Sequence, residues 1–399
     1  MFEGALSGYK ILDVTHYMAG PYCTKLLAMY GAEVIKVEKP QTGDGVRRLG
    51  PFVGDDPHIE KSVHHLFLNA GKKSITLNLK APSGVEIFKR LVKDADILVE
   101  NFEPRVMPSL GLAYEELVKI NPDLVMVSIS NFGQTGPYRD YRAAEIVEYA
   151  LSGLMKLTGA SHREPLKLGL DVAQYTAGQS ALPPMLAALY SARFTSEGQH
   201  VDISIMDYCA GLAEVQTGIF DCKGQITERV GNYNDKGHPW GNFPCRDGWV
   251  TIAIHGTRMS YLTDLMGIPE MMDARFANPT SRLQHREEID RLMLPWLSEH
   301  SKKEPFEYLN TKPECGAGWV RDAQDLLECP QLASQGFYGA IEHPLLGKVR
   351  FPGPPCKLSK TPMRIERAPL LGEDNEKIYS AWLGYTRSDL VELRQAGVI

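Results

Sequence analysis

Three clusters of cationic and amide side chains stand next to stretches of the sequence that predict β-strands. They are Lys36 with Lys39, Asn69 with Lys72 and Lys73, and Asn101 with Arg105. Each cluster alone is typical of a solvated loop. Together they suit a ligand that carries phosphates, because lysine and arginine pair with phosphate and an asparagine amide can bond to an adenine or to pantetheine. The pattern therefore indicates a nucleotide-bearing ligand.

Other chemistries lack their motifs. The turn after the first predicted strand reads HYMAGP (16–21) instead of GxGxxG, which disfavours NAD or FAD, and neither GxxxxGK[ST] nor HExxH occurs. His64 and His65 are adjacent, so their side chains point in different directions on a regular element. The seven cysteines form no CxxC pair, which predicts reduced thiols and neither a disulfide framework nor a metal site.

The elements that position these residues follow an alternating pattern. Two apolar runs, 10–15 and 32–38, flank a helical stretch that has Pro21 near its start and Gly31 at its end, which predicts a βαβ unit. The pattern recurs with strands predicted at 74–79, 96–100 and 124–133. We therefore expect an α/β fold with a doubly wound parallel sheet, whose ligand binds beyond the carboxyl ends of the strands.

The second half of the chain has a different residue pattern. Residues 144–195 are rich in small residues and helical in pattern, and 198–220 predicts a strand that feeds one long helix. A loop rich in Gly, Asn and Pro (230–248) leads to a strand at 249–254, and the pattern from residue 331 is extended again. These changes indicate more than one domain.

The composition is that of a globular protein. The chain has 399 residues, of which 43% are hydrophobic and 23% are charged, and a net charge of −6 gives no basic footprint for nucleic acid. It contains no run of about 18 apolar residues and no signal-peptide pattern at the N-terminus. We therefore expect a soluble, cytoplasmic protein with no nucleic-acid or membrane partner.

A series of motifs, in order, resembles one family. The motifs are residues 6–40, GDGVRR (43–48), LNAGKKSITLNLK (68–80), DADILVENFEP (94–104), VSISNFGQTGP (127–137), RFANPTSR (275–282), IEHPLLGKV (341–349), KLSKTP (357–362) and LLGEDNEKI (370–378). They closely resemble the class III CoA-transferases, which include formyl-CoA:oxalate and carnitine CoA-transferases and enzymes that activate benzylsuccinate. The resemblance implies a large doubly wound domain (1–220), a smaller domain (221–325), a return to the large domain (326–399), and two interlocked chains.

The resemblance also implies covalent chemistry with no permanent cofactor and no metal. In the family, an Asp attacks an acyl-CoA thioester to form a mixed anhydride. The CoA thiolate then converts this anhydride into an aspartyl-CoA thioester, and the acceptor carboxylate completes the exchange. Covalent catalysis of this kind splits one difficult acyl transfer into easier steps.

The sequence departs from the family at the nucleophile. The stretch PLKLGLDVAQYTAG (165–178) aligns without a gap and places Gln174 where the family has its Asp. A carboxamide is a poor nucleophile. Asp171 lies three residues earlier and is the alternative nucleophile, although an Asp there also suits a helix N-cap. The chain thus most resembles the subunit without the Asp in succinyl-CoA:(R)-benzylsuccinate CoA-transferase, a heteromer of anaerobic aromatic degradation.

Other family residues carry over by position. The resemblance places His16, Met18 and Ala19 in the loop near the thioester, and it matches further positions to contacts with CoA, namely Lys39, Asn69, Lys73, Asn101 and Phe102. A basic residue usual in the family is Ser109 here, with Arg105 four residues upstream. The loop from Gly231 to Gly241 matches a mobile loop that shields the active site.

Three alternatives remain open. A homodimeric transferase would use Asp171, and a CoA-ester-binding protein would use the retained loops without turnover. An α-methylacyl-CoA racemase would need the acid and base of its proton relay, but the positions that match its G-H-D motif are Ala143, Ala144 and Glu145.

Overall fold

The computed structural model describes residues 4–354 and 356–399, which form two compact units. Unit 1 consists of Met1–Leu154, Lys167–Val215 and Ala333–Ile399, and unit 2 consists of Met155–Leu166 and Gln216–Leu332. The chain passes between the units four times: in the helices α7 (Leu154–Leu157), α11 (Glu214–Lys223) and α17 (Pro330–Ser334), and between Leu166 and Lys167. The division at residues 220 and 325 remains a prediction about independently folding domains.

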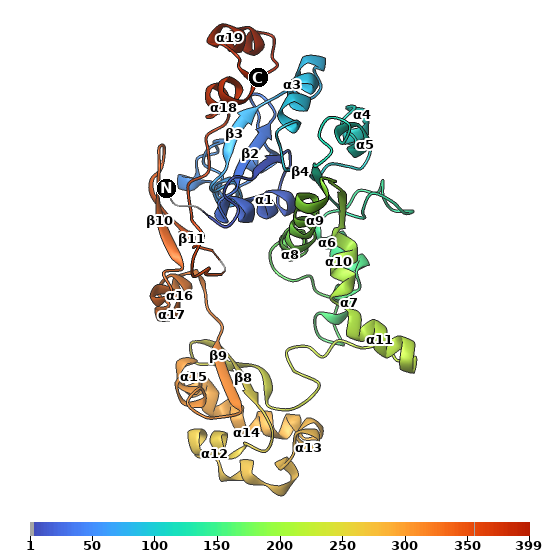
Figure 1. The fold of residues 1–399 in the computed structure, drawn as a ribbon. Coiled ribbons are helices and arrows are strands. Elements are labelled where there is room, and N and C mark those ends of the chain that lie inside the picture. The colour runs from blue at the N-terminus through green and yellow to red at the C-terminus, as the bar shows by residue number, and fades with distance from the viewer. Residues whose placement is uncertain (1–3, 355) are drawn as a thin grey trace. The chain divides into compact units, whose positions relative to one another are not determined.

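Unit 1 is built on a six-stranded parallel sheet in the order β3-β2-β1-β4-β5-β6 (Figure 1). The strands are β1 (Lys10–Asp13), β2 (Glu33–Glu38), β3 (Lys73–Thr76), β4 (Ile97–Glu100), β5 (Val125–Ser130) and β6 (His200–Ser204). The predicted doubly wound α/β fold is confirmed. In this strand order the winding reverses between β1 and β4, and ligands of such sheets bind at that reversal.

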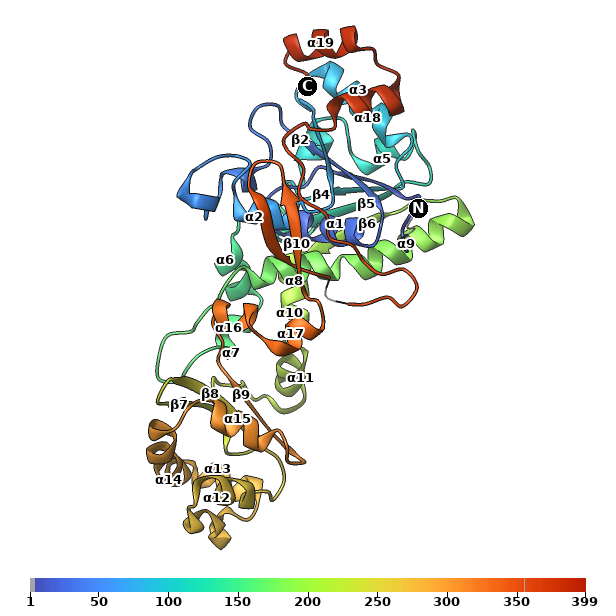
Figure 2. The same ribbon diagram turned by 90° about the vertical axis from the view of Figure 1, so that its left-hand side faces the viewer.

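Helices cover both faces of this sheet (Figure 2). Successive side chains of a strand point to opposite faces, so Leu12 packs under one helical layer and Ile11 under the other. The first layer contains α3 (Pro82–Val92), α18 (Asn375–Leu383) and α19 (Arg387–Gln395). The second contains α1 (Ala19–Met29), α8 (Val172–Ser180), α9 (Leu182–Thr195) and α10 (Ile205–Gly211). Shorter helices in the connections are α2 (Val63–Leu68), α4 (Val106–Ser109), α5 (Tyr114–Leu117) and α6 (Glu145–Leu151).

The predicted βαβ unit is present with the predicted start and stop signals. Pro21 lies in the first turn of α1, where its missing N–H costs no hydrogen bond. Gly31 follows the end of α1 with φ +99, a left-handed conformation that a helix end commonly requires and that glycine adopts without strain.

Helix α8 packs unusually close to α1. A Cβ built on Gly178 would lie 2.3 Å from the backbone oxygen of Ala19, so only glycine permits this approach. Gly178 therefore fixes the distance between the two helices. It also holds the preceding turn of α8, which carries Gln174, near the start of α1.

One predicted element is wrong. The stretch 198–220, predicted as a strand that feeds one long helix, contains β6 and two helices, α10 and α11, which are separated at Leu212 and Ala213. Gly211 is the last residue of α10, and glycine has among the lowest helix propensities of all residues.

Unit 2 has a core of its own around a three-stranded antiparallel sheet. Its strands are β7 (Trp240–Cys245), β8 (Gly248–Ile254) and β9 (Cys315–Trp319). The helices of this unit are α12 (Ser260–Met266), α13 (Pro279–Gln284), α14 (Arg286–Glu299), α15 (Lys303–Leu309) and α16 (Ala323–Leu327), of which α12, α14 and α15 contribute side chains to the core. Unit 1 also holds a hairpin of β10 (Tyr338–His343) and β11 (Gly347–Pro352). Of the helices in the described residues, none is long and apolar enough to cross a membrane.

Candidate active site

Two loops meet where the sheet reverses. The backbone N–H of His16, three residues beyond β1, donates to Asn101 Oδ1 at 2.7 Å, and Asn101 Nδ2, directly beyond β4, donates to the backbone oxygen of His16 at 2.8 Å. The rings of His16 and Phe102 lie 5.4 Å apart. Of the residues predicted from the sequence, His16, Asn101 and Phe102 are therefore brought together at the expected edge of the sheet.

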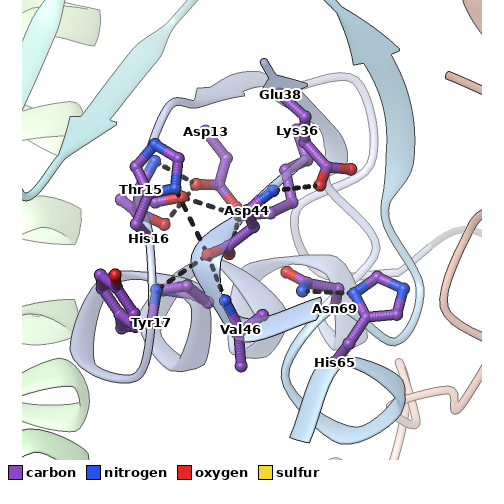
Figure 3. A network of polar contacts seen from close by, with 12 residues as sticks. Asp13, Thr15, His16, Tyr17, Lys36, Glu38, Asp44, Val46, His65 and Asn69 are labelled. Atoms are coloured by element: carbon purple, nitrogen blue, oxygen red, sulfur yellow. Dashed lines mark hydrogen bonds and ion pairs between the residues drawn. The ribbon is translucent and has the colours of Figure 1, made fainter. Parts of the chain in front are cut away.

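Asp44 anchors this loop and lies between His16, Tyr17 and Lys36 (Figure 3). Its Oδ1 accepts from the backbone N–H groups of Tyr17 at 3.1 Å and Val46 at 3.0 Å, and it lies 3.3 Å from His16 Nδ1. Tyr17 has φ +64 and is 54% exposed, which is a strained position for a tyrosine. The contacts of Asp44 therefore hold the loop in a conformation that the sequence alone does not favour.

A buried set of charges supports Asp44. Lys36 Nζ lies 3.0 Å from Asp44 Oδ2, and Lys72 Nζ donates to Asp13 Oδ2 at 2.8 Å, with all four side chains inaccessible to solvent. Burial opposes the ionisation of Asp13, but Lys36 and Lys72 outweigh it and lower its pKa to about 2. Burial lowers the pKa of Lys72 to about 8. Lys36 and Lys72 are thus committed to the protein interior and unable to meet a phosphate.

Of the predicted CoA contacts, Lys73 lies at the other edge of the sheet and Asn69 is buried. Lys73 is the first residue of β3, and its ammonium pairs with Glu33, the first residue of β2, so it lies toward the amino end of the sheet. Asn69 is fully buried, where it accepts from Lys72 at 2.8 Å and contacts His65 at 3.0 Å. The placement predicted for Lys73 is wrong because this residue begins a parallel strand and so lies at the opposite edge from residues that end one. Asn69 does lie near the carboxyl end of β1, through Lys72 and Asp13, but its amide is held there by protein partners.

The remaining predicted residues divide into open and packed positions. Lys39 is exposed directly after β2 and lines a cavity of about 500 Å³ together with Thr76, Asn78 and Arg394. Arg105 is exposed and pairs with Glu103. The helix-start residues Met18 and Ala19 are buried, and Met18 packs against Val46 and Leu68. Lys39 is therefore the predicted cation best placed to meet a ligand.

Gln174 lies in the first turn of α8 among acidic side chains. Its Nε2 donates to Glu148 Oε2 at 2.7 Å, and its backbone N–H donates to Glu145 Oε2 at 3.1 Å. Glu145 Oε1 also accepts from the backbone N–H of Ala173 at 2.9 Å. Glu145 thus satisfies N–H groups that a helix start leaves without partners.

Asp171, the alternative nucleophile, stands at the N-cap position of α8. Its side chain makes no capping hydrogen bond, and the residue is partly exposed. The predicted structural role for Asp171 is therefore taken by Glu145. The carboxylate of Asp171 raises the pKa of the nearby Tyr175, on which burial has the larger effect.

Sequence reasoning missed Glu148, Glu100 and Asp44, and it named Glu145 only as a racemase position. Glu145 and Glu148 are spaced i, i+3, which places them on one helical face, and this spacing was the available signal. Glu100, at the end of β4, is buried and has its pKa raised to about 7 by burial. Asp44 stands in the GDG motif at 43–45, but no local pattern reveals that its carboxylate binds the loop after β1.

The fold and this edge of the sheet define a doubly wound α/β protein with a candidate ligand site at the strand reversal. Residues 6–375 match the sequence pattern of CoA-transferase family III. The chain belongs to this family. Its reactions use CoA thioesters as substrates, and the described residues contain no group of three or more His, Cys, Asp or Glu that could hold a metal ion.

Relatives of known activity cover the whole chain. It is 33% identical over 398 residues to a succinyl-CoA–D-citramalate CoA-transferase from Chloroflexus aurantiacus, covering 99% of this chain and 98% of the relative. It is 33% identical over 420 residues to a formyl-CoA:oxalate CoA-transferase from Streptomyces coelicolor, covering 100% of both chains. A solved CAIB/BAIF family protein from Brucella suis is 29% identical with a TM-score of 0.86, covering 95% and 100% of the two chains.

Proposed function

We propose that this chain is the non-catalytic subunit of a heteromeric class III CoA-transferase. The enzyme moves CoA from an acyl-CoA, most simply succinyl-CoA, to a carboxylic acid such as (R)-benzylsuccinate. An Asp-bearing paralogue supplies the nucleophile, and the two chains interlock.

The observation that carries this proposal is the state of Gln174. Its amide nitrogen is bound to Glu148, and its backbone N–H to Glu145. A carboxamide held in this way has no charge to attack a thioester. Position 174 is where the resemblance expects the nucleophilic Asp, so this arrangement supports a site that holds a ligand without reacting.

The retained loops support CoA-ester binding by the same chain. His16 and Asn101 remain cross-bonded at the reversal, and Lys39 remains exposed beside a cavity. The succinyl-CoA donor is supported by the relative from Chloroflexus aurantiacus.

Exposed apolar side chains support a protein partner. On α9, Tyr190 and Phe194 are 69% and 71% exposed, with ring centroids 4.8 Å apart. Leu170, directly before Asp171, is 83% exposed. The paired rings of Tyr190 and Phe194 are typical of a surface that a partner chain buries, whereas Leu170 is a separate exposed side chain.

The test is the intact mass of the purified chain after incubation with succinyl-CoA. We expect no covalent CoA adduct on this chain, and an adduct on an added Asp-bearing paralogue. An adduct on this chain alone that disappears in an Asp171→Ala variant would instead establish a catalyst that uses Asp171. Binding of the ester with no adduct on either chain would identify a CoA-ester-binding protein.

A further inference from the structure

The ammonium of Lys25 is buried without a counter-ion. Lys25 lies in the middle of α1 and is 4% exposed. Among the described residues no carboxylate acts on it: burial and, to a smaller extent, the ammonium of Lys72 both lower its pKa, to about 7. Lysines are almost never this deeply buried unless they are paired. Lys25 therefore differs from Lys36 and Lys72, each of which pairs with a buried aspartate.

Three aromatic rings gather beside this ammonium. Lys25 Nζ lies 3.3 Å from the ring centroid of Phe67, in α2, and 6.0 Å from that of Tyr22, one turn earlier in α1. The ring of Tyr175, in α8, lies 5.0 Å from that of Tyr22 and 6.4 Å from that of Phe67. We call Tyr22, Phe67 and Tyr175 the aromatic cluster. Each of the three side chains is half-buried, so the cluster reaches the protein surface.

The aromatic cluster offsets only part of the cost of burying this charge. A ring face attracts a cation, but it carries no net charge. The ionisable groups that face Lys25 are Tyr22 on its own helix, Tyr175 on α8 and Lys72 before β3. Burial raises the pKa of both tyrosines above the usual value, with Asp171 adding to the shift of Tyr175, so both phenols stay neutral near pH 7. An anionic ligand would supply the charge that these neighbours lack.

The aromatic cluster also joins Lys25 to the candidate site. All three rings pack against the core cluster that contains Met18, the residue before α1. Met18 and Lys25 are seven residues apart, which places them on one face of the helix and about 10 Å apart along its axis. Tyr175 directly follows Gln174 in α8. A ligand whose carbonyl lies beside Met18 can therefore extend a few atoms along the rings toward Lys25.

We propose that Lys25 binds the free carboxylate of a CoA monoester of a dicarboxylic acid, while the aromatic cluster contacts the carbon chain between this carboxylate and the thioester. The inference rests on the proposed function and names the class of ester that its site accepts. Succinyl-CoA and the CoA ester of benzylsuccinate each keep one free carboxylate, so the same contact serves the donor and the product. An ester of a monocarboxylic acid would leave the ammonium unpaired.

The first experiment compares two esters that differ only at the far end of the acyl chain. Butyryl-CoA has a methyl group where succinyl-CoA has its carboxylate, and each ester is titrated into the purified full-length chain. At pH 6.5 we expect the wild type to bind succinyl-CoA about 10- to 100-fold more tightly, the usual effect of a hydrogen bond to a charged group. In Lys25→Met, which keeps an apolar chain without the charge, this preference should disappear. A preference that survives in Lys25→Met would overturn the inference.

The pH dependence of this preference tests the charge of Lys25 and needs no variant. Only the ammonium form pairs with a carboxylate, and its share falls about tenfold for each pH unit above the pKa. Between pH 6.5 and pH 8.5 we expect the preference of the wild type for succinyl-CoA to fall about tenfold. Titration of the CoA phosphates cancels in this ratio, because both esters carry the same CoA. Lys25→Arg, which stays charged throughout, should keep the preference at both pH values. A wild-type preference that does not change with pH would contradict the assignment to Lys25.

The controls separate this inference from the proposed function. Lys119→Met removes an exposed lysine that pairs with Glu116, and it should bind both esters like the wild type. Circular dichroism checks that it and Lys25→Met keep the fold. If both esters bind the wild type equally, the inference is wrong and the proposed CoA-ester binding stands. If neither ester binds, the proposed binding fails and this inference fails with it. A covalent adduct on the wild-type chain would refute its non-catalytic role alone.

Discussion

At the scale of single residues, Asp44 holds the loops of the candidate site together, although the sequence analysis did not select it. One carboxylate binds two backbone N–H groups, the His16 ring and the buried ammonium of Lys36. Burial opposes its ionisation, but Lys36 and His16 outweigh burial and hold the pKa of Asp44 far below its usual range. The carboxylate therefore stays charged at any pH where the protein works.

We expect Asp44→Ala to destabilise the fold by about 3–5 kcal/mol, the usual cost of leaving one member of a buried ion pair alone. The variant should also lose affinity for CoA esters, because the loop at Tyr17 loses its anchor. Urea unfolding and CoA-ester titration measure the two effects.

The control for this prediction is Asp56→Ala, which removes an exposed partner of Lys61. Such surface pairs contribute little, so this variant should unfold like the wild type. If Asp44→Ala also unfolds like the wild type, the charge network does not support the loop.

Local sequence patterns revealed only some residues of the candidate site. Asn101 was found because it follows a strand of a recognisable pattern, and His16 and Phe102 were found only through the resemblance to a family. Lys73 was misplaced because a charge beside a strand does not reveal which edge it faces, and the burial of Asn69 was not visible in the sequence. Glu148 was missed because its significance arises only when α6 and α8 pack together.

At the scale of elements, Gly178 sets how closely α8 approaches α1. We expect Gly178→Ala to cost about 1–3 kcal/mol, since the added methyl would overlap the backbone oxygen of Ala19 and the helices cannot separate without disturbing the core. Thermal unfolding measures the loss.

A helical glycine in open space provides the comparison. A Cβ added to Gly218 in α11 would meet nothing within 4 Å, so Gly218→Ala should be neutral or stabilising, as helix propensity dictates. If the two variants behaved alike, close packing at α1 would not be the reason for glycine at 178.

The elements of the sheet were predictable because buried parallel strands leave continuous apolar runs and because Pro21 and Gly31 mark a helix. The break between α10 and α11 was not predictable in the same way. Both halves have helical patterns, and only Gly211 hinted at the interruption.

At the scale of the whole molecule, exposed rings on α9 predict assembly. We expect a Tyr190→Ser/Phe194→Ser variant to lose its partner chain while keeping its fold, because both side chains are more than two-thirds exposed and contribute little to the core of unit 1. Light scattering reports the assembly and circular dichroism the fold. An unchanged mass in solution would place the partner surface elsewhere.

The sheet of unit 1 also determines when this protein can fold during its synthesis. One face of the sheet is covered partly by Ile378 and Tyr379 of α18 and by Val398 and Ile399, which are made long after β6. At the usual speed of translation, about 10 to 35 s pass between the synthesis of β6 and that of α18. Throughout that interval one face of the nascent sheet is covered by α3 but not yet by α18 and the C-terminal residues, so we expect the chain to need a chaperone on the ribosome before it can meet any partner.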